Sequence, residues 1–183
     1  MTLLLTAIRF AAEKHQKQRR RDEVTPYINH PIEVATVLWS DGKVRESEMI
    51  AAAVLHDILE DTQTLSQEIQ TLFGDKVLAW VEEVTDDKSL PKQERKRLQI
   101  VHAQSASPGA KQIKMADKIC NLRDLMVRPP HDWTLDRKLQ YLSWSDQVMD
   151  GLRGCNALLE SLFDQVLQEA RQHYRQTSPG MPL

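Results

Sequence analysis

Apolar residues recur every three or four positions along most of the chain, and this period restricts its fold more than any other feature. Leu4, Ala7, Ile8 and Ala11 form one such stripe, and the segment 46–61 carries another. A period near 3.6 residues is typical of amphipathic helices, whereas a half-buried strand alternates apolar and polar residues. No stretch of the sequence shows that alternation convincingly. The pattern therefore predicts an all-α protein, a compact bundle of many helices.

Prolines, glycines and polar residues predict where the helices begin and end. One helix should have His30 at its cap and Pro31 at its first position, where the missing N–H group of proline costs nothing. Thr64 and Gln67 resemble a capping box at the start of a short helix that ends at Gly74. Further helices are expected over 46–61, 77–84, 91–106 and 113–125, and from 134 past 167 with a candidate break at 151–154.

The length of 183 residues suggests one domain, large enough to bury a core without disulfides or structural zinc. We expect this domain over residues 1–175 and a disordered tail over 176–183. No apolar run approaches the ~20 residues of a membrane-spanning helix, and no signal peptide is expected. Cys120 and Cys155 are both expected in helices as buried free thiols, which favours a reducing compartment and a cytoplasmic protein.

Charge excludes one class of partner and points to a local anion site. The chain has 24 Lys and Arg against 26 Asp and Glu, a formal net charge of −2. Such a chain is a poor candidate for bulk binding of nucleic acid or an anionic membrane. A polyanion would have to meet a local basic patch, which the segment 14–21 supplies. A second basic run, 92–97, contains Glu94 and is expected to be a solvated face, with phosphate contact as the alternative.

Acidic and imidazole side chains interrupt the apolar run near residue 56. His56 and Asp57 follow four apolar residues, and Glu60 and Asp61 come four positions later, so all four should share one helical face. Three carboxylates and an imidazole this close repel one another unless a cation is present. The alternative interpretation is a solvated helix end with a satisfied core histidine.

A second group of polar residues lies on an inward helix face. Asp117 and Asn121 occupy the apolar stripe of their helix, while Lys114 and Lys118 are expected to point elsewhere. A carboxylate there needs a metal ion or a cationic partner, and a structural ion pair is the alternative. His30 alone is weak evidence. The four-residue set suits a divalent ion such as Mn²⁺, Fe²⁺, Co²⁺ or Zn²⁺, and its members are His30, His56, Asp57 and Asp117.

The order of these four residues resembles the HD superfamily of metal-dependent phosphohydrolases. Further stretches resemble the hydrolase domain of the RelA/SpoT family, most closely its small stand-alone members, the metazoan-type SpoT homologues. The resemblance covers about residues 5–160. The matching stretches are Gln18-Arg19-Arg20-Arg21-Asp22, 25–31, Ala53-Val54-Leu55-His56-Asp57 with Glu60-Asp61-Thr62, 81–88, 90–92, 94–97, 107–111 and 114–125.

The resemblance implies an HD-domain bundle that hydrolyses the alarmones ppGpp and pppGpp, releasing pyrophosphate from the ribose 3′ position with Mn²⁺ (manganese). It implies that the four-residue set binds the metal and that Glu60 and Asp61 orient and deprotonate the attacking water. Substrate contacts are implied for Arg20, Arg21, Asn121 and Tyr141. Small homologues commonly have lysine where this chain has Arg21, and the loop that follows is about one residue shorter here.

Three other functions fit part of the pattern. NADPH 2′-phosphatase activity is associated with the small homologues and uses the same metal site. A catalytically inactive nucleotide-binding regulator is a second alternative, although such a sensor would not need Glu60 and Asp61. An all-α interaction module without a ligand would leave Asp117 and the acidic cluster unexplained. The expected partner is a guanine nucleotide or NADPH, with no nucleic acid and no membrane, and the sequence leaves the oligomeric state open.

Overall fold

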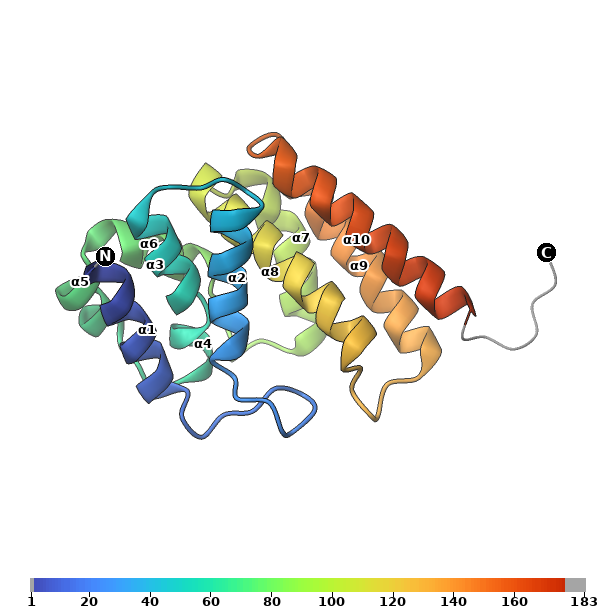
Figure 1. Ribbon diagram of the computed structural model, residues 1–183, viewed down its shortest axis with the longest axis horizontal. Coiled ribbons are helices and arrows are strands. Elements are labelled where there is room, and N and C mark those ends of the chain that lie inside the picture. Colours follow the sequence, from blue (N-terminus) through green and yellow to red (C-terminus); the bar gives the residue numbers. More distant parts are fainter. Residues whose placement is uncertain (1, 177–183) are drawn as a thin grey trace.

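The computed structural model describes residues 2–176, and within that range it contains helices, one isolated bridge between Arg19 and Pro26, and no β-strand. The all-α prediction is therefore confirmed. Figure 1 shows the helices of this range in chain order. They are α1 (Thr2–Lys14), α2 (Asn29–Ser40), α3 (Ser47–Leu55), α4 (Ile58–Asp61), α5 (Ser66–Phe73), α6 (Asp75–Val84), α7 (Lys92–Ser105), α8 (Pro108–Val127), α9 (Leu135–Leu152) and α10 (Ala157–Gln176).

Helix α8 is the centre of the bundle. It contacts α2, α3 and α6 on one side and α9 and α10 on the other, and Figure 1 shows it between these two groups. A helix surrounded by neighbours is buried around most of its circumference, and α8 accordingly buries residues on several faces, including Asp117 and Lys118. Asp117 and Lys118 therefore project into the interior of the molecule, whereas the other charged side chains of α8 are partly exposed.

The expected continuous helix over 46–61 is wrong, because the chain breaks at His56 and Asp57. Helix α3 ends at Leu55 and the four-residue α4 begins at Ile58. Asp57 has φ −99° and ψ 0°, a sparsely allowed conformation in which active-site residues are often found. Ile58 is fully buried and anchors the far side of the break. His56 and Asp57 thus lie in the turn between the two helices, and Glu60 and Asp61 lie on α4.

Three helix starts also differ from the prediction. Helix α2 begins at Asn29, so His30 is inside its first turn and Pro31 is its third residue, a position that proline still tolerates. Helix α8 begins at Pro108, where Ser107 accepts a hydrogen bond from the Ala110 amide at 3.3 Å. The capping box does not form, because α5 begins after Leu65 and the Thr64 hydroxyl bonds to that of Thr62 instead.

The end of the chain follows the sequence pattern more closely. The candidate break is present, since α9 ends at Leu152 and α10 begins at Ala157. Helix α10 extends to Gln176, and the rest of the expected tail, 177–183, lies outside the described residues. Both cysteines are free thiols, but Cys155 is half-buried in the loop before α10 and not in a helix as expected.

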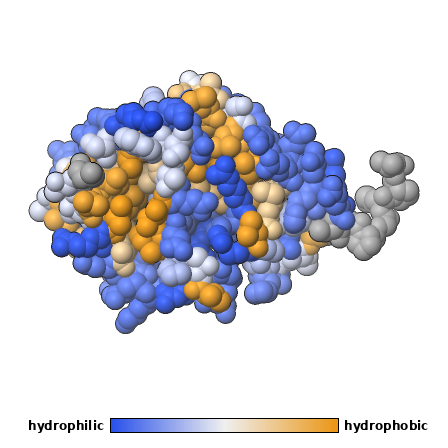
Figure 2. Space-filling view, in the orientation of Figure 1, coloured by the Kyte–Doolittle hydropathy of each residue, from blue (hydrophilic) through white to orange (hydrophobic). Residues whose placement is uncertain are grey.

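Apolar side chains gather on one outer face. Figure 2 shows them over the part of the molecule formed by α1, α2 and α3. They line a groove of about 550 Å³, and its lining residues include Leu4, Ile32 and Trp39. The exposed fraction of Trp39 is 48%. Among the described residues, no helix is both long enough and apolar enough to cross a membrane.

Candidate metal centre and adjoining cleft

Two imidazoles and two carboxylates from three parts of the chain converge on one point. His30 comes from α2, His56 and Asp57 from the turn after α3, and Asp117 from α8. His30 Nε2 lies 3.1 Å from Asp117 Oδ1, and His56 Nε2 lies 3.0 Å from Asp57 Oδ2. The two cross distances, His30 to Asp57 and His56 to Asp117, are both 3.8 Å.

The hydrogen bonds around this cluster leave a ligating atom free. His56 Nδ1 donates to the Ala53 carbonyl at 2.8 Å, which fixes the ring and directs the lone pair of Nε2 into the cluster. That Nε2 atom is buried and, although Asp57 Oδ2 lies 3.0 Å away, it forms no well-aligned hydrogen bond among the described residues. Tyr27 donates its hydroxyl to Asp57 Oδ2 at 2.6 Å. His30, His56 and Asp117 offer ligand atoms within 4.8 Å of one another, a set that fits one divalent cation.

The charges in the cluster shift its pKa values in opposite directions. Burial disfavours the charged form of His56, but Asp57 and Asp117 outweigh it and raise the His56 pKa to about 9. Burial likewise opposes ionisation of Asp117, yet the Lys118 ammonium and His30 hold its pKa well below the usual value. Lys118 Nζ is 3.2 Å from Asp117 Oδ2 and Lys118 is buried, so the expectation that Lys118 points elsewhere is wrong.

Glu60 lies beside the cluster with one oxygen held by the backbone. Its Oε2 accepts a hydrogen bond from the Asp86 amide at 3.2 Å, and its Oε1 is 3.7 Å from Arg95 Nη1. Burial, together with the charges of Asp57 and Asp86, raises the Glu60 pKa. A carboxylate with a raised pKa is better able to take a proton near neutral pH.

Asp61, the next residue, has different partners. Its Oδ2 accepts a hydrogen bond from Gln18 Nε2 at 2.8 Å, and its Oδ1 pairs with Lys88. Glu60 and Asp61 both line a cleft of about 530 Å³ that also reaches His30, Asp57 and Asp117. The acidic pair and three of the four converging residues therefore face the same space.

The cleft is strongly basic away from the carboxylates. Nine Lys or Arg residues line it, against five Asp or Glu. Three basic residues of the run 92–97 line the cleft, which favours the alternative of phosphate contact for them, whereas Arg97 pairs with Glu94 on the surface at 2.6 Å. Lys114, expected to point elsewhere, also lines it. The cationic residues are Arg19, Arg20, Arg21, Lys88, Lys92, Arg95, Lys96, Lys114 and Lys118.

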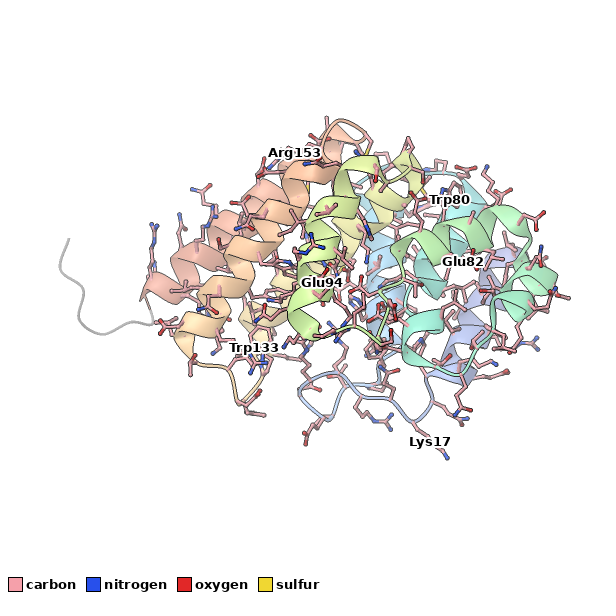
Figure 3. All side chains as sticks on the ribbon, turned by 180° about the vertical axis from the view of Figure 1, so that it is seen from behind. Lys17, Trp80, Glu82, Glu94, Trp133 and Arg153 are labelled. Carbon is pink, nitrogen blue, oxygen red and sulfur yellow. The ribbon has the colours of Figure 1, made fainter. Side chains whose placement is uncertain are left out.

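The predicted basic patch over 14–21 divides into two groups. Arg19, Arg20 and Arg21 line the cleft, whereas Lys14 and Lys17 line a neighbouring hollow. Lys14 pairs with Glu68 at 2.8 Å and is therefore partly neutralised. Figure 3 shows Lys17 at the outer edge of the molecule, pointing away from it.

Asn121 links the predicted substrate residue Arg20 to Asp117, one of the four converging residues. Asn121 Nδ2 donates to Asp117 Oδ1 at 2.5 Å, and Asn121 Oδ1 accepts from Arg20 Nη2 at 3.1 Å. Arg20 also forms an ion pair with Asp124 at 2.7 Å, so its guanidinium is held in place before any ligand binds.

An aromatic wall closes the other end of the cleft. The ring of Tyr141 lies between those of Trp133 and Trp144, with centroid distances of 5.4 and 5.3 Å. The Arg21 guanidinium lies 4.9 Å from the Trp133 ring, and Lys96 Nζ lies 4.7 Å from the Trp144 ring. Exposed faces of aromatic rings with adjacent cations can hold a planar base beside a phosphate group.

Comparison with known proteins agrees with this geometry. The model of the HD domain family matches residues 7–142. The chain belongs to the HD domain family. A curated relative from Xenopus tropicalis, named guanosine-3′,5′-bis(diphosphate) 3′-pyrophosphohydrolase MESH1, is 50% identical over 168 residues, 91% of this chain and 94% of its own length. The protein of that name from Homo sapiens is 49% identical over 91% of this chain and 93% of its own length.

Two solved structures have a similar fold. A structure described as a metazoan ortholog of SpoT that hydrolyzes ppGpp superposes with a TM-score of 0.89 and 46% identity, covering 92% of this chain and 96% of that one. A Listeria monocytogenes protein superposes with a TM-score of 0.65 and 27% identity, covering 80% of this chain and 99% of that one. The predicted resemblance to the SpoT homologues is confirmed.

Proposed function

We propose that this chain hydrolyses ppGpp and pppGpp, releasing pyrophosphate from the ribose 3′ position to leave GDP or GTP. The relatives of similar length carry the name of this activity, and a structural neighbour hydrolyzes ppGpp. The observation that carries the proposal is the juxtaposition of Glu60 and Asp61 with the four converging residues in one basic cleft. A polyanionic substrate, a cation site and a carboxylate base are all accommodated there.

We further propose that His30, His56, Asp57 and Asp117 hold Mn²⁺. Two imidazole nitrogens and two carboxylate oxygens form a mixed donor set suited to a borderline ion, and the unpartnered Nε2 of His56 supports a cation at this position. When bound, such an ion supplies Lewis-acid polarisation of a phosphoryl oxygen.

Glu60 is the proposed general base and Asp61 the residue that orients water. The Glu60 pKa is raised, its Oε2 is fixed by the Asp86 amide, and the side chain lines the cleft. Proton transfer to Glu60 removes the proton of the attacking water as its oxygen approaches phosphorus. Asp61 accepts a hydrogen bond from the same water and thereby directs the lone pair of the water oxygen toward phosphorus.

Basic, amide and aromatic residues of the cleft bind the nucleotide. Arg20 and Arg21 present planar donor forks that suit phosphate oxygens, and Lys92 and Lys96 add charge at the far wall. Asn121 lies between Arg20 and Asp117, where it can contact the ribose. Tyr141 supports the base through the aromatic wall. We place this activity in one domain over 1–175 and in the cytoplasm, which the two free cysteines support.

The experiment is turnover of ppGpp, pppGpp and NADPH by the purified chain, with Mn²⁺ and with a chelator. We expect pyrophosphate and GDP from ppGpp with Mn²⁺ and none with the chelator. If only NADPH loses a phosphate, the same site acts on a 2′-phosphate and the proposed substrate is wrong. If ppGpp binds without turnover, the chain is a nucleotide-binding regulator and not an enzyme.

A further inference from the structure

Two side chains outside the metal cluster form a hydrogen-bonded chain that ends on Asp61. His15, in the turn after α1, has an exposed fraction of only 2%. Its Nδ1 lies 2.7 Å from Gln18 Oε1, and Gln18 Nε2 lies 2.8 Å from Asp61 Oδ2. The roles proposed above involve neither His15 nor Gln18.

The direction of every hydrogen bond in this chain is fixed by chemistry. An ionised carboxylate only accepts hydrogen bonds, so the Gln18 amide must turn its NH₂ group toward Asp61. The Gln18 carbonyl oxygen then faces His15 and can only accept, so His15 must carry its proton on Nδ1. One arrangement of the three groups therefore makes both hydrogen bonds, and a rotated Gln18 side-chain amide would lose both. The other ring nitrogen of His15, Nε2, is buried and has no hydrogen-bond partner among the described residues.

His15 and Gln18 are also held in place by contacts that do not involve Asp61. The His15 ring packs on the Tyr27 ring at a centroid distance of 4.9 Å. The backbone N–H of Gln18 donates to the backbone carbonyl of His15 at 2.9 Å, and the backbone carbonyl of Gln18 accepts from the backbone N–H of Tyr27 at 3.1 Å. The backbone of Gln18 is thus held by other bonds, so replacing its side chain leaves the loop in place.

The other partner of Asp61 offers less constraint. Lys88 pairs with the second oxygen, Oδ1, but the Lys88 side chain is 48% exposed and has a long flexible stem. Exposed ion pairs of this kind fix geometry weakly. Glu60, by contrast, has a rigid backbone donor in the Asp86 amide. Gln18 is therefore the partner that determines where the Asp61 carboxylate points.

We propose that His15 and Gln18 are positioning residues that hold the Asp61 carboxylate in its working orientation. The proposal rests on the role proposed for Asp61 in directing the attacking water. Misplacement of a catalytic group by about 1 Å can cost ~10²-fold in rate. Loss of the Gln18 bond should therefore lower kcat and leave metal and substrate binding intact, because neither His15 nor Gln18 belongs to the converging four residues.

The first test compares two glutamines in the same loop. Gln18→Leu should lower kcat roughly 10- to 100-fold, the usual cost of losing a residue that orients a site. KM, manganese content and melting temperature should stay unchanged. The control is Gln16→Leu, since the Gln16 side chain is exposed and lies two positions away, and its kcat should equal that of the unchanged chain.

The second test separates the hydrogen bond of His15 from its packing. His15→Phe keeps a ring against Tyr27 but has no donor, whereas His15→Asn keeps an N–H donor in a smaller side chain. We expect His15→Phe to lose kcat as Gln18→Leu does, and His15→Asn to recover most of it. Equal kcat values for these two variants, or a full-rate Gln18→Leu, would overturn the proposal.

A double-mutant cycle distinguishes this proposal from the role of Asp61 itself. In an Asp61→Asn background, adding Gln18→Leu should lower kcat little further, because His15 and Gln18 act through the Asp61 carboxylate. An undiminished loss there would show that Gln18 acts elsewhere and would contradict the proposal. If Asp61→Asn alone turns over normally, it is the proposed role of Asp61 that fails.

Discussion

At the scale of single residues, the surroundings of Glu60 decide what it can do. It lies on the short helix α4, one backbone amide fixes its Oε2, and burial raises its pKa. A carboxylate with a raised pKa is partly protonated at a higher pH than an exposed glutamate. The paired nitrogens of Lys88 and Arg95 both lie more than 3.5 Å from Glu60 Oε1. Such a group is suited to proton transfer more than to ligating a metal.

Glu60→Gln should therefore retain fold and metal but lose about 10²–10⁴-fold in kcat, the usual range for a lost general base. The amide keeps the size of the side chain and still accepts from the Asp86 amide, but it cannot take a proton. The measurements are metal content, melting temperature and kcat of the purified variant. Loss of the metal would make Glu60 a ligand, and near-normal turnover would place the base elsewhere.

The pKa of His56 predicts how metal affinity depends on pH. In the metal-free protein this pKa is about 9, above the ordinary value of 6.5, so the imidazole is protonated at pH 7. This charge stabilises the metal-free fold below pH 6.5, and the stabilisation is lost as the pH rises through 9.

A divalent ion needs the neutral ring, so binding at pH 7 should release one proton, and affinity should rise about tenfold per pH unit up to the His56 pKa. Calorimetric titration of the metal-free protein in buffers of different ionisation enthalpy measures the proton release. Affinity that does not change between pH 7 and pH 8 would contradict this assignment.

At the scale of elements, the start of α8 depends on a glycine that leaves room for a neighbouring ring. A Cβ atom built on Gly109 would lie 2.2 Å from Trp80 Nε1 of α6, far inside any allowed contact. Glu83 of α6 also bonds to the Ser107 hydroxyl at 2.6 Å, so the two helices are joined at this point. The position of Asp117, further along α8, depends on this contact.

Gly109→Ala should therefore destabilise the protein by about 1–3 kcal/mol, the usual cost of overpacking. Because the ring must move or α8 must shift, the double variant with Trp80→Leu should recover part of the loss. Denaturant unfolding of the three proteins measures this. A Gly109→Ala variant as stable as the unchanged chain would show that the Trp80 ring moves freely.

The helices were largely predictable from sequence, but their interruptions were not. Apolar periodicity identified α1 and α8, and Gly74 correctly predicted the end of α5. The break at His56 was missed because Ala53, Val54 and Leu55 continue the apolar pattern into it. What ends α3 is the convergence of His56 and Asp57 on residues more than 25 positions away, which no local pattern records.

At the scale of the whole molecule, the proposed metal site joins the central helix α8 to one side of the bundle. Its residues come from α2, from the turn between α3 and α4, and from the central helix α8. A ligand that binds only the folded chain at 100 times its Kd adds about 2.7 kcal/mol to stability. For a chain of this length that corresponds to a rise in melting temperature of about 5–10 °C.

Chelation should therefore lower the melting temperature of the loaded protein by about this amount. Asp57→Ala should remove metal, activity and the response to chelator together, because the turn loses its carboxylate ligand. Thermal scans of both proteins with and without Mn²⁺ measure this. A variant that still responds to Mn²⁺ would show that the ion binds elsewhere.

The converging residues were predictable from sequence, but much of the cleft around them was not. His56 and Asp117 stood out because charged groups on apolar stripes are costly. Lys92, Arg95 and Lys96 did not, because a basic run with an interspersed glutamate has the same pattern on an open surface as in a cleft. Only the packing of α7 against α9 turns these three residues toward the substrate space.

The aromatic wall gives the protein an optical signal of its own. Of the four tryptophans, Trp144 lines the cleft and Trp133 contacts the Tyr141 ring beside it, whereas Trp39 lies in the outer groove. A guanine base stacked on this wall should quench indole emission. Titration with ppGpp in the presence of chelator should therefore change the fluorescence of the unchanged chain and of Trp39→Phe, but much less that of Trp144→Phe, because Trp144 is the tryptophan that lines the cleft. An equal response from all three proteins would place the base outside the wall. If the prediction holds, tryptophan emission reports nucleotide binding without any label and separately from turnover.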